Sequence, residues 1–228
     1  MSSLRTVLVA GLALAASYSA RADSSGQAWL ETYYLNPRPA ELSRAVHSMS
    51  NAGWFETKGN PAMAIGFLAT VFATNPERIN GWLEDLSDLP LSHRRLIAAS
   101  LWQAGHPFGA ELLKRLGTDS SVRDEVHALA SRASTPIAQT PVASPSSMHL
   151  QWGAFLASGH ERHVVAILDS MGTDRPGLDL AARQSLAQNA VAHPRVLEIC
   201  RVQLDRQPES VRSELRAALN AAAPKPGA

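Results

Sequence analysis

Residues 60–76 read NPAMAIGFLATVFATNP, and this stretch decides the fold class of the chain. An Asn-Pro pair stands at each of its ends. Asn before Pro is typical of a helix start, because the Asn side chain accepts hydrogen bonds from unpaired backbone N–H groups and Pro removes no donor that the first helical turn needs. The stretch therefore predicts helices that begin near Asn60 and Asn75, and the pair Asn36-Pro37 predicts another.

The same helical signature continues through the rest of the chain. Apolar residues recur at three- and four-residue spacing in segments 79–86, 96–104, 122–129, 148–156, 164–171, 196–204 and 211–219. Glycines suited to left-handed helix ends follow several apolar stripes, namely Gly53, Gly105, Gly117, Gly159 and Gly172. Alternating polar and apolar runs rich in β-branched residues, which are typical of strands, are absent. The chain is therefore predicted to be all-α.

Short helices in series predict stacked antiparallel helical hairpins, arranged as a degenerate α-solenoid or an irregular helical bundle. Ala64, Leu68 and Pro76 have the small, large and Pro spacing of the second helix of a tetratricopeptide repeat. The preceding segment lacks the Trp and Leu-Gly positions of that motif. No second copy follows at the repeat period of about 34 residues.

The N-terminus has the pattern of a secretory signal peptide, residues 1–22. Arg5 supplies a positive charge, residues 7–16 form an apolar stretch, and Ala20-Arg21-Ala22 fits a signal peptidase site. The apolar stretch is shorter than the roughly 20 residues that a membrane-spanning helix needs. No Cys lies near the cleavage point, so lipid attachment is not expected. Export to the periplasm or the medium separates the protein from cytosolic ATP, NADH and nucleic acid.

The exported part divides into two predicted lobes. Removal of 22 of the 228 residues leaves 206, which suits one large domain or two small ones. Residues 134–147 (STPIAQTPVASPSS) have three prolines and no charge, and they predict a linker. We expect an N-terminal helical lobe at 23–133, a C-terminal helical lobe at 148–222 and a disordered tail at 223–228.

The charge balance and the cysteine content limit the kinds of partner that the chain is expected to bind. Loss of Arg5 and Arg21 leaves 19 basic residues against 20 acidic ones, which favours neither nucleic acid nor an anionic membrane surface. No second apolar stretch is long enough for stable membrane insertion. Cys200 is the only cysteine, so no disulfide forms within the chain. Its apolar surroundings favour buried packing; a reactive thiol or an intermolecular disulfide is the alternative.

Aromatic residues gather in the N-terminal lobe. Ten lie between Trp29 and Phe108, and only two follow. They predict an aromatic-lined surface for a peptide, a glycan or an apolar ligand, and the alternative is a large core. Three bulky residues in a row at 33–35 cannot all face inward on one helix. The candidate partner-binding residues are Trp29, Tyr33, Tyr34, Trp54 and Phe55.

Catalytic and metal-binding patterns are incomplete. His160 and His163 in the sequence HERH are three residues apart and could supply two metal ligands. Spacing identifies no third ligand, and a solvated helix start is the alternative, so no metal site and no cofactor are predicted. The serine-hydrolase and phosphate-loop motifs are missing. Glu31 and Glu56 could cleave glycosides only if the fold paired them.

Two parts of the chain resemble a family of exported bacterial proteins of unknown function. The N-terminal part consists of WLETYYLNP at 29–37, GWF at 53–55 and AIGF at 64–67, which lead to Asn75-Pro76. The C-terminal part consists of WGAFLASG at 152–159, SLAQNA at 185–190 and His193-Pro194. The resemblance implies an exported all-helical protein and brings no activity, cofactor or catalytic residue.

The sequence thus favours a non-enzymatic interaction or scaffold module of the bacterial cell envelope. Its expected partner is another envelope protein or a peptide, because stacked helices present extended binding surfaces. The alternative is an envelope hydrolase that acts on glycan or peptide. That function would require carboxylates and histidines to converge, as Glu31 with Glu56 or His160 with His163.

Overall fold

The computed structural model describes residues 26–105, 123–171 and 175–222, and within these ranges the chain is helical with no strand. A first helix at 26–32 is followed by η1 (Tyr33–Leu35), η2 (Pro39–Glu41), α2 (Leu42–Asn51), η3 (Trp54–Glu56), α3 (Asn60–Thr74), η4 (Pro76–Arg78), α4 (Ile79–Asp85) and α5 (Leu91–Gln103). Next come α7 (Arg123–Ala130), η5 (Ile137–Gln139), α8 (Pro145–Ser158) and α9 (Glu161–Leu168). The last helices are α10 (Pro176–Ala192), α11 (Pro194–Gln203) and α12 (Glu209–Ala222). The all-α prediction is confirmed.

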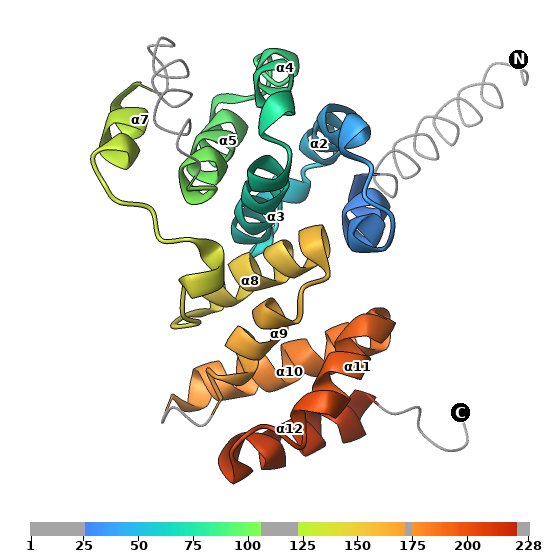
Figure 1. Ribbon diagram of the computed structural model, residues 1–228. Coiled ribbons are helices and arrows are strands. Elements are labelled where there is room, and N and C mark those ends of the chain that lie inside the picture. The colour runs from blue at the N-terminus through green and yellow to red at the C-terminus, as the bar shows by residue number, and fades with distance from the viewer. Residues whose placement is uncertain (1–25, 106–122, 172–174, 223–228) are drawn as a thin grey trace, which may run out of the picture.

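The α8 helix is at the centre of the arrangement. It lies between the group formed by α2, α3, α4 and α5 and the group formed by α9, α10, α11 and α12 (Figure 1). Its main partner is α3, and it also packs on α9, while α10 packs on α11 and α12. The two predicted lobes are therefore in direct contact through α3 and α8.

The core extends through both predicted lobes. Phe67 and Phe72 of α3 are fully buried, as are Trp152 and Phe155 of α8. The same apolar cluster continues to Leu215 of α12. Burial of aromatic side chains on both sides of the α3–α8 contact contributes strongly to the stability of this junction.

Asn60-Pro61 and Asn75-Pro76 stand at helix starts, but not through the capping bonds that we expected, and the prediction of a helix start at Asn36-Pro37 is wrong because the next helix, η2, begins at Pro39. The Asn60 side chain donates to the backbone oxygen of Trp54 at 2.8 Å, and the Asn75 side chain donates to that of Val71 at 2.9 Å. Neither accepts a bond from the helix that follows. Both side-chain amides instead donate to backbone carbonyl groups of the preceding segment. Carbonyl groups at the end of a helix need such partners, just as N–H groups at the start of a helix do.

Residues 134–147 are anchored to the protein by two apolar side chains, although most of the segment is exposed. Ile137 and Val142 are buried, and η5 forms one short turn. A capping box closes the segment, because Ser144 and Ser147 exchange side-chain and backbone hydrogen bonds at the start of α8. The helix therefore begins three residues before the boundary that we placed at 148.

The left-handed helix ends are confirmed at three of the predicted glycines. Gly53, Gly105 and Gly159 have φ angles of 69°, 63° and 65°. Gly117, Gly172, the predicted signal peptide and the predicted tail lie outside the described residues. Within the described ranges, no helix combines the length and apolarity that crossing a membrane requires.

Candidate partner-binding site

Three of the five predicted partner-binding residues belong to the core. Trp29, Tyr33 and Phe55 are each less than 5% exposed. Trp29 and Tyr33 pack edge-on against Phe67, with ring centroids 5.3 and 5.2 Å away. The structure thus favours the core alternative for these three side chains, because a buried ring offers no surface to a partner. Tyr34 and Trp54 are the two that remain partly exposed.

Tyr34 links the N-terminal segment to the C-terminal helices. Its ring centroid lies 5.2 Å from that of Phe155 in α8 and 5.7 Å from that of His193 at the start of α11. The hydroxyl is 3.5 Å from His193 Nδ1, at the long limit of a hydrogen bond. The ring also covers Gly159, where an added Cβ would lie 3.1 Å from Tyr34 Cδ2. These contacts fix the position of a half-buried tyrosine.

Two exposed apolar side chains are close in sequence to the residues of this tyrosine contact. Leu35 follows Tyr34 directly, Val191 precedes His193 by two residues, and each is 67% exposed. They are the most exposed of the large apolar residues in the described part of the chain. We call Tyr34, Leu35 and Val191 the Tyr34 surface. Exposed apolar groups that form a contiguous patch mark protein-contact sites, and these residues are the candidates for such a patch.

Electrostatics keep the centre of this surface uncharged. Burial lowers the pKa of His193, and the Glu31 carboxylate offsets part of that effect. Burial raises the pKa of Tyr34. Both groups are therefore neutral near pH 7, so a partner that covers them does not have to displace water from a charge.

A second polar arrangement contains the residue types of a hydrolase. Ser50 Oγ lies 2.8 Å from His93 Nδ1, and His93 Nε2 lies 2.8 Å from Glu56 Oε1. A carboxylate only accepts, so His93 Nε2 carries a proton, and in the neutral ring Nδ1 accepts from the Ser50 hydroxyl. The chain Ser50–His93–Glu56 has the order of a serine-hydrolase relay. Spacing in the sequence gave no signal for it, since its members come from α2, η3 and α5.

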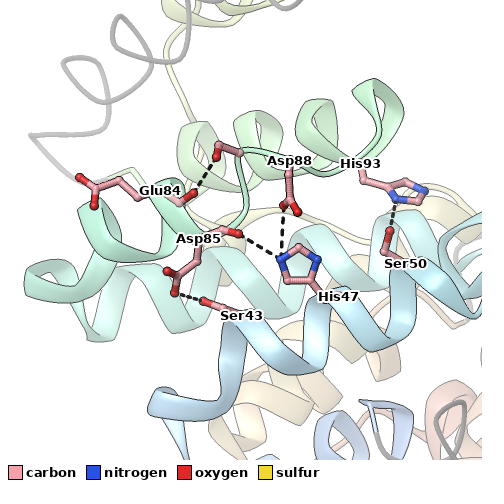
Figure 2. A network of polar contacts seen from close by, with 8 residues as sticks. Ser43, His47, Ser50, Glu84, Asp85, Asp88 and His93 are labelled. Carbon is pink, nitrogen blue, oxygen red and sulfur yellow. Dashed lines mark hydrogen bonds and ion pairs between the residues drawn. The ribbon is translucent and has the colours of Figure 1, made fainter.

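The surroundings of Ser50 favour a structural role for the Ser50–His93–Glu56 contacts. The backbone N–H groups of Ala52 and Gly53, which follow Ser50, already donate to Ser48 O and Ser50 O at 3.1 and 3.2 Å. They are not available to stabilise an oxyanion. Ser50 and His93 belong to a row of polar contacts between α2 and the α4–α5 region (Figure 2).

The other contacts in that row also join α2 to the α4–α5 region. Ser43 Oγ donates to Asp85 Oδ2 at 2.7 Å, and His47 Nε2 donates to the backbone oxygen of Asp85 at 3.0 Å. Figure 2 shows that Ser43, His47 and Ser50 all extend from α2 toward this region. The row therefore links α2 to both α4 and α5.

The two predicted carboxylates lie beside different histidines, and the two predicted histidines have different hydrogen-bond partners. Glu31 acts on His193, whereas Glu56 contacts His93. His160 Nδ1 accepts from the Arg162 backbone at the start of α9, and His163 Nδ1 contacts Gln151 in the core. Among the described residues, no group of three or more His, Cys, Asp or Glu side chains could hold a metal ion.

Comparison with known proteins adds no relative: no family model, no curated protein and no solved structure matches the chain. The fold and the geometry of the Tyr34 surface therefore define the class of protein. It is an all-α helical protein with an ordered, partly apolar surface where its N-terminal segment meets the C-terminal helices.

Proposed function

We propose that this chain is an exported, non-enzymatic interaction module of the bacterial cell envelope, which binds another envelope protein or a peptide through the Tyr34 surface. The observation that carries the proposal is the pair of exposed apolar side chains, Leu35 and Val191, which are close in sequence to the two residues of the Tyr34–His193 contact. A partner segment with apolar side chains would bury these groups and gain the corresponding hydrophobic free energy.

The sequence supports the envelope location through the signal-peptide pattern at residues 1–22. The near balance of acidic and basic residues favours a partner recognised by shape and apolar contact rather than by charge.

The test is capture of partners from the envelope fraction with the wild-type protein and with Leu35→Ser, Val191→Ser and Val202→Ser. Val202 is 41% exposed on α11 and supplies the matched control. The proposal expects one partner that is retained by Val202→Ser and lost from the other two variants, with all melting temperatures nearly equal. Equal capture by all four proteins would refute it.

The Ser50–His93–Glu56 chain has the residue types of a second candidate function, an envelope hydrolase acting on glycan or peptide, although its surroundings favour a structural role. Its test is labelling of the folded protein with a fluorophosphonate probe, with Ser50→Ala as the control. Labelling that depends on Ser50 would establish an activated serine. We expect no labelling, because the backbone N–H groups of Ala52 and Gly53 already donate within the protein and cannot stabilise an oxyanion.

A further inference from the structure

The outer face of α10 carries no charge, unlike the outer faces of the two helices that pack on it. The exposed residues described on α10 are Gly177, Leu180, Gln184, Gln188, Val191 and Ala192. By contrast, charged side chains are exposed on α11 (Arg195, Glu198 and Arg201) and on α12 (Glu209 and Arg216). Surface helices usually expose charged side chains, as α11 and α12 do. The outer face of α10 therefore differs from its surroundings.

The two charged residues of α10 are half-buried. Arg183 Nη1 pairs with Glu214 Oε2 of α12 at 2.9 Å. One carboxylate oxygen of Asp179 is completely buried. The ion pair holds α10 against α12 and leaves the outer face of α10 to uncharged side chains.

Five residues of the outer face form one stripe along α10. Leu180, Gln184, Ala187 and Val191 follow one another at spacings of four, three and four residues, which places them on one side of the helix, and Gln188 lies next to them. We call these five residues the α10 stripe. Leu180 and Val191, at its two ends, are 45% and 67% exposed. With apolar ends and an amide-rich centre, the stripe has the same chemical order in both directions.

This order fits a second copy of the chain that runs in the opposite direction. In a two-fold dimer the same contact occurs twice, once from each copy. A pairing centred between residues 185 and 186 places Leu180 of one copy opposite Val191 of the other at both ends. Gln184 of each copy then lies next to Gln188 of the other. An amide side chain both donates and accepts, so these glutamines can exchange hydrogen bonds.

The lack of charge also fits a second copy. Near a two-fold axis a charged side chain faces its own counterpart, and like charges that meet across an interface are unfavourable. The α10 stripe brings no such charges together. We propose that α10 is a self-association surface, at which two copies of the chain pack antiparallel through the α10 stripe. A single helix covers less than the roughly 800 Å² per partner of a standard interface, so the dimer is weak and reversible.

The inference does not rest on the proposed function, although the α10 stripe and the Tyr34 surface share Val191. Leu35 belongs to the Tyr34 surface alone. Leu35→Ser therefore separates the two proposals, because it should leave self-association unchanged while it removes partner capture.

Disulfide crosslinking tests the antiparallel pairing. Leu180→Cys and Val191→Cys are oxidised at about 1 mM, each alone and as an equal mixture, with the wild-type protein as the control because Cys200 is buried. In the antiparallel pair, position 180 faces position 191, whereas two copies of either position are about 16 Å apart along the helices, too far for a disulfide. We expect a crosslinked dimer from the mixture and little from either variant alone. Equal crosslinking in the three samples, or none from the mixture, would overturn the proposal.

Sedimentation equilibrium measures the strength of the dimer between about 10 μM and 1 mM protein. Gln184→Glu places two carboxylates near the two-fold axis, and Gln139→Glu makes the same change at an exposed position of η5. We expect Gln184→Glu to weaken dimerisation at least about tenfold, and Gln139→Glu and Leu35→Ser to leave it unchanged. A wild-type protein that stays monomeric at about 1 mM, or equal dimerisation of Gln184→Glu, would contradict self-association through α10.

Discussion

Gly66 of α3 and Gly153 of α8 lie where the two helices pack together, and the backbone of the opposite helix leaves neither position room for a side chain. A Cβ on Gly66 would lie 2.0 Å from the backbone oxygen of Leu150, and a Cβ on Gly153 would lie 1.9 Å from that of Met63. Backbone atoms cannot move aside as a flexible side chain can. The close approach of α3 and α8, which joins the two predicted lobes, therefore requires glycine at both positions.

Gly66→Ala and Gly153→Ala are expected to destabilise the protein, each by about 1–3 kcal/mol or more, because the added methyl group forces the helices apart. Urea unfolding followed by circular dichroism measures the change. Gly81→Ala in α4 is the control, since a Cβ there meets no atom within 4 Å. That control should raise stability slightly through helix propensity. Similar stability of Gly66→Ala and Gly81→Ala would contradict this close packing.

Gln151→Leu is expected to destabilise the protein because it removes three hydrogen bonds. The Nδ1–H group of His163 and the backbone oxygen of Thr140 would lose the partner that Gln151 supplies, whereas the backbone oxygen of Ile137 would keep the N–H of Thr140. An unsatisfied buried group costs about 1–3 kcal/mol. Gln139→Leu, at an exposed position of η5, is the control. Equal unfolding midpoints for the two variants would show that the Gln151 bonds contribute little.

Stability is expected to fall as the pH decreases below about 6.5. Burial lowers the pKa of His163 from 6.5 to about 3. Between these values the unfolded chain binds a proton that the folded protein does not, so acid favours unfolding, with a slope of up to about 1.4 kcal/mol per pH unit from this group. Urea unfolding between pH 4 and 8 measures the slope, and NMR titration follows His163 directly. An ordinary pKa for His163 would contradict its burial.

The Cys200 thiol is expected to be unreactive in the folded protein. It is completely buried in α11, and burial raises its pKa to about 12. Ellman's reagent should react with it only after denaturation, because the thiolate is the nucleophile. Rapid reaction of the folded protein, or a disulfide-linked dimer on a non-reducing gel, would instead support the alternative of a reactive or intermolecular cysteine.

Local signals in the sequence predicted the helices well. The periodic apolar stripes coincide with seven helices, namely α4, α5, α7, α8, α9, α11 and α12. The glycine helix ends at 53, 105 and 159 were also predicted. The start of α8 was missed, although Ser144 and Ser147 have the spacing of a capping box and could have located it.

Contacts between distant segments could not be predicted. Gly66 and Gly153 carry no mark of their pairing, since each looks like an ordinary glycine within a helix. Likewise, no spacing rule connects Tyr34 to His193, or Gln151 to His163. The aromatic candidates differ in burial. Trp29 and Tyr33 share a helix face that packs inward, whereas Tyr34 is only half-buried.

The most direct test of the proposed function is photocrosslinking in cells from position 35. A benzophenone amino acid replaces Leu35 in one variant and Val202 in another, and adducts are separated by electrophoresis and identified by mass spectrometry. The proposal predicts one dominant adduct with an envelope protein or peptide from position 35, which is lost when Val191→Ser is added, and no such adduct from position 202. The same adducts from both positions, or none from position 35, would contradict the proposal that the Tyr34 surface binds a partner.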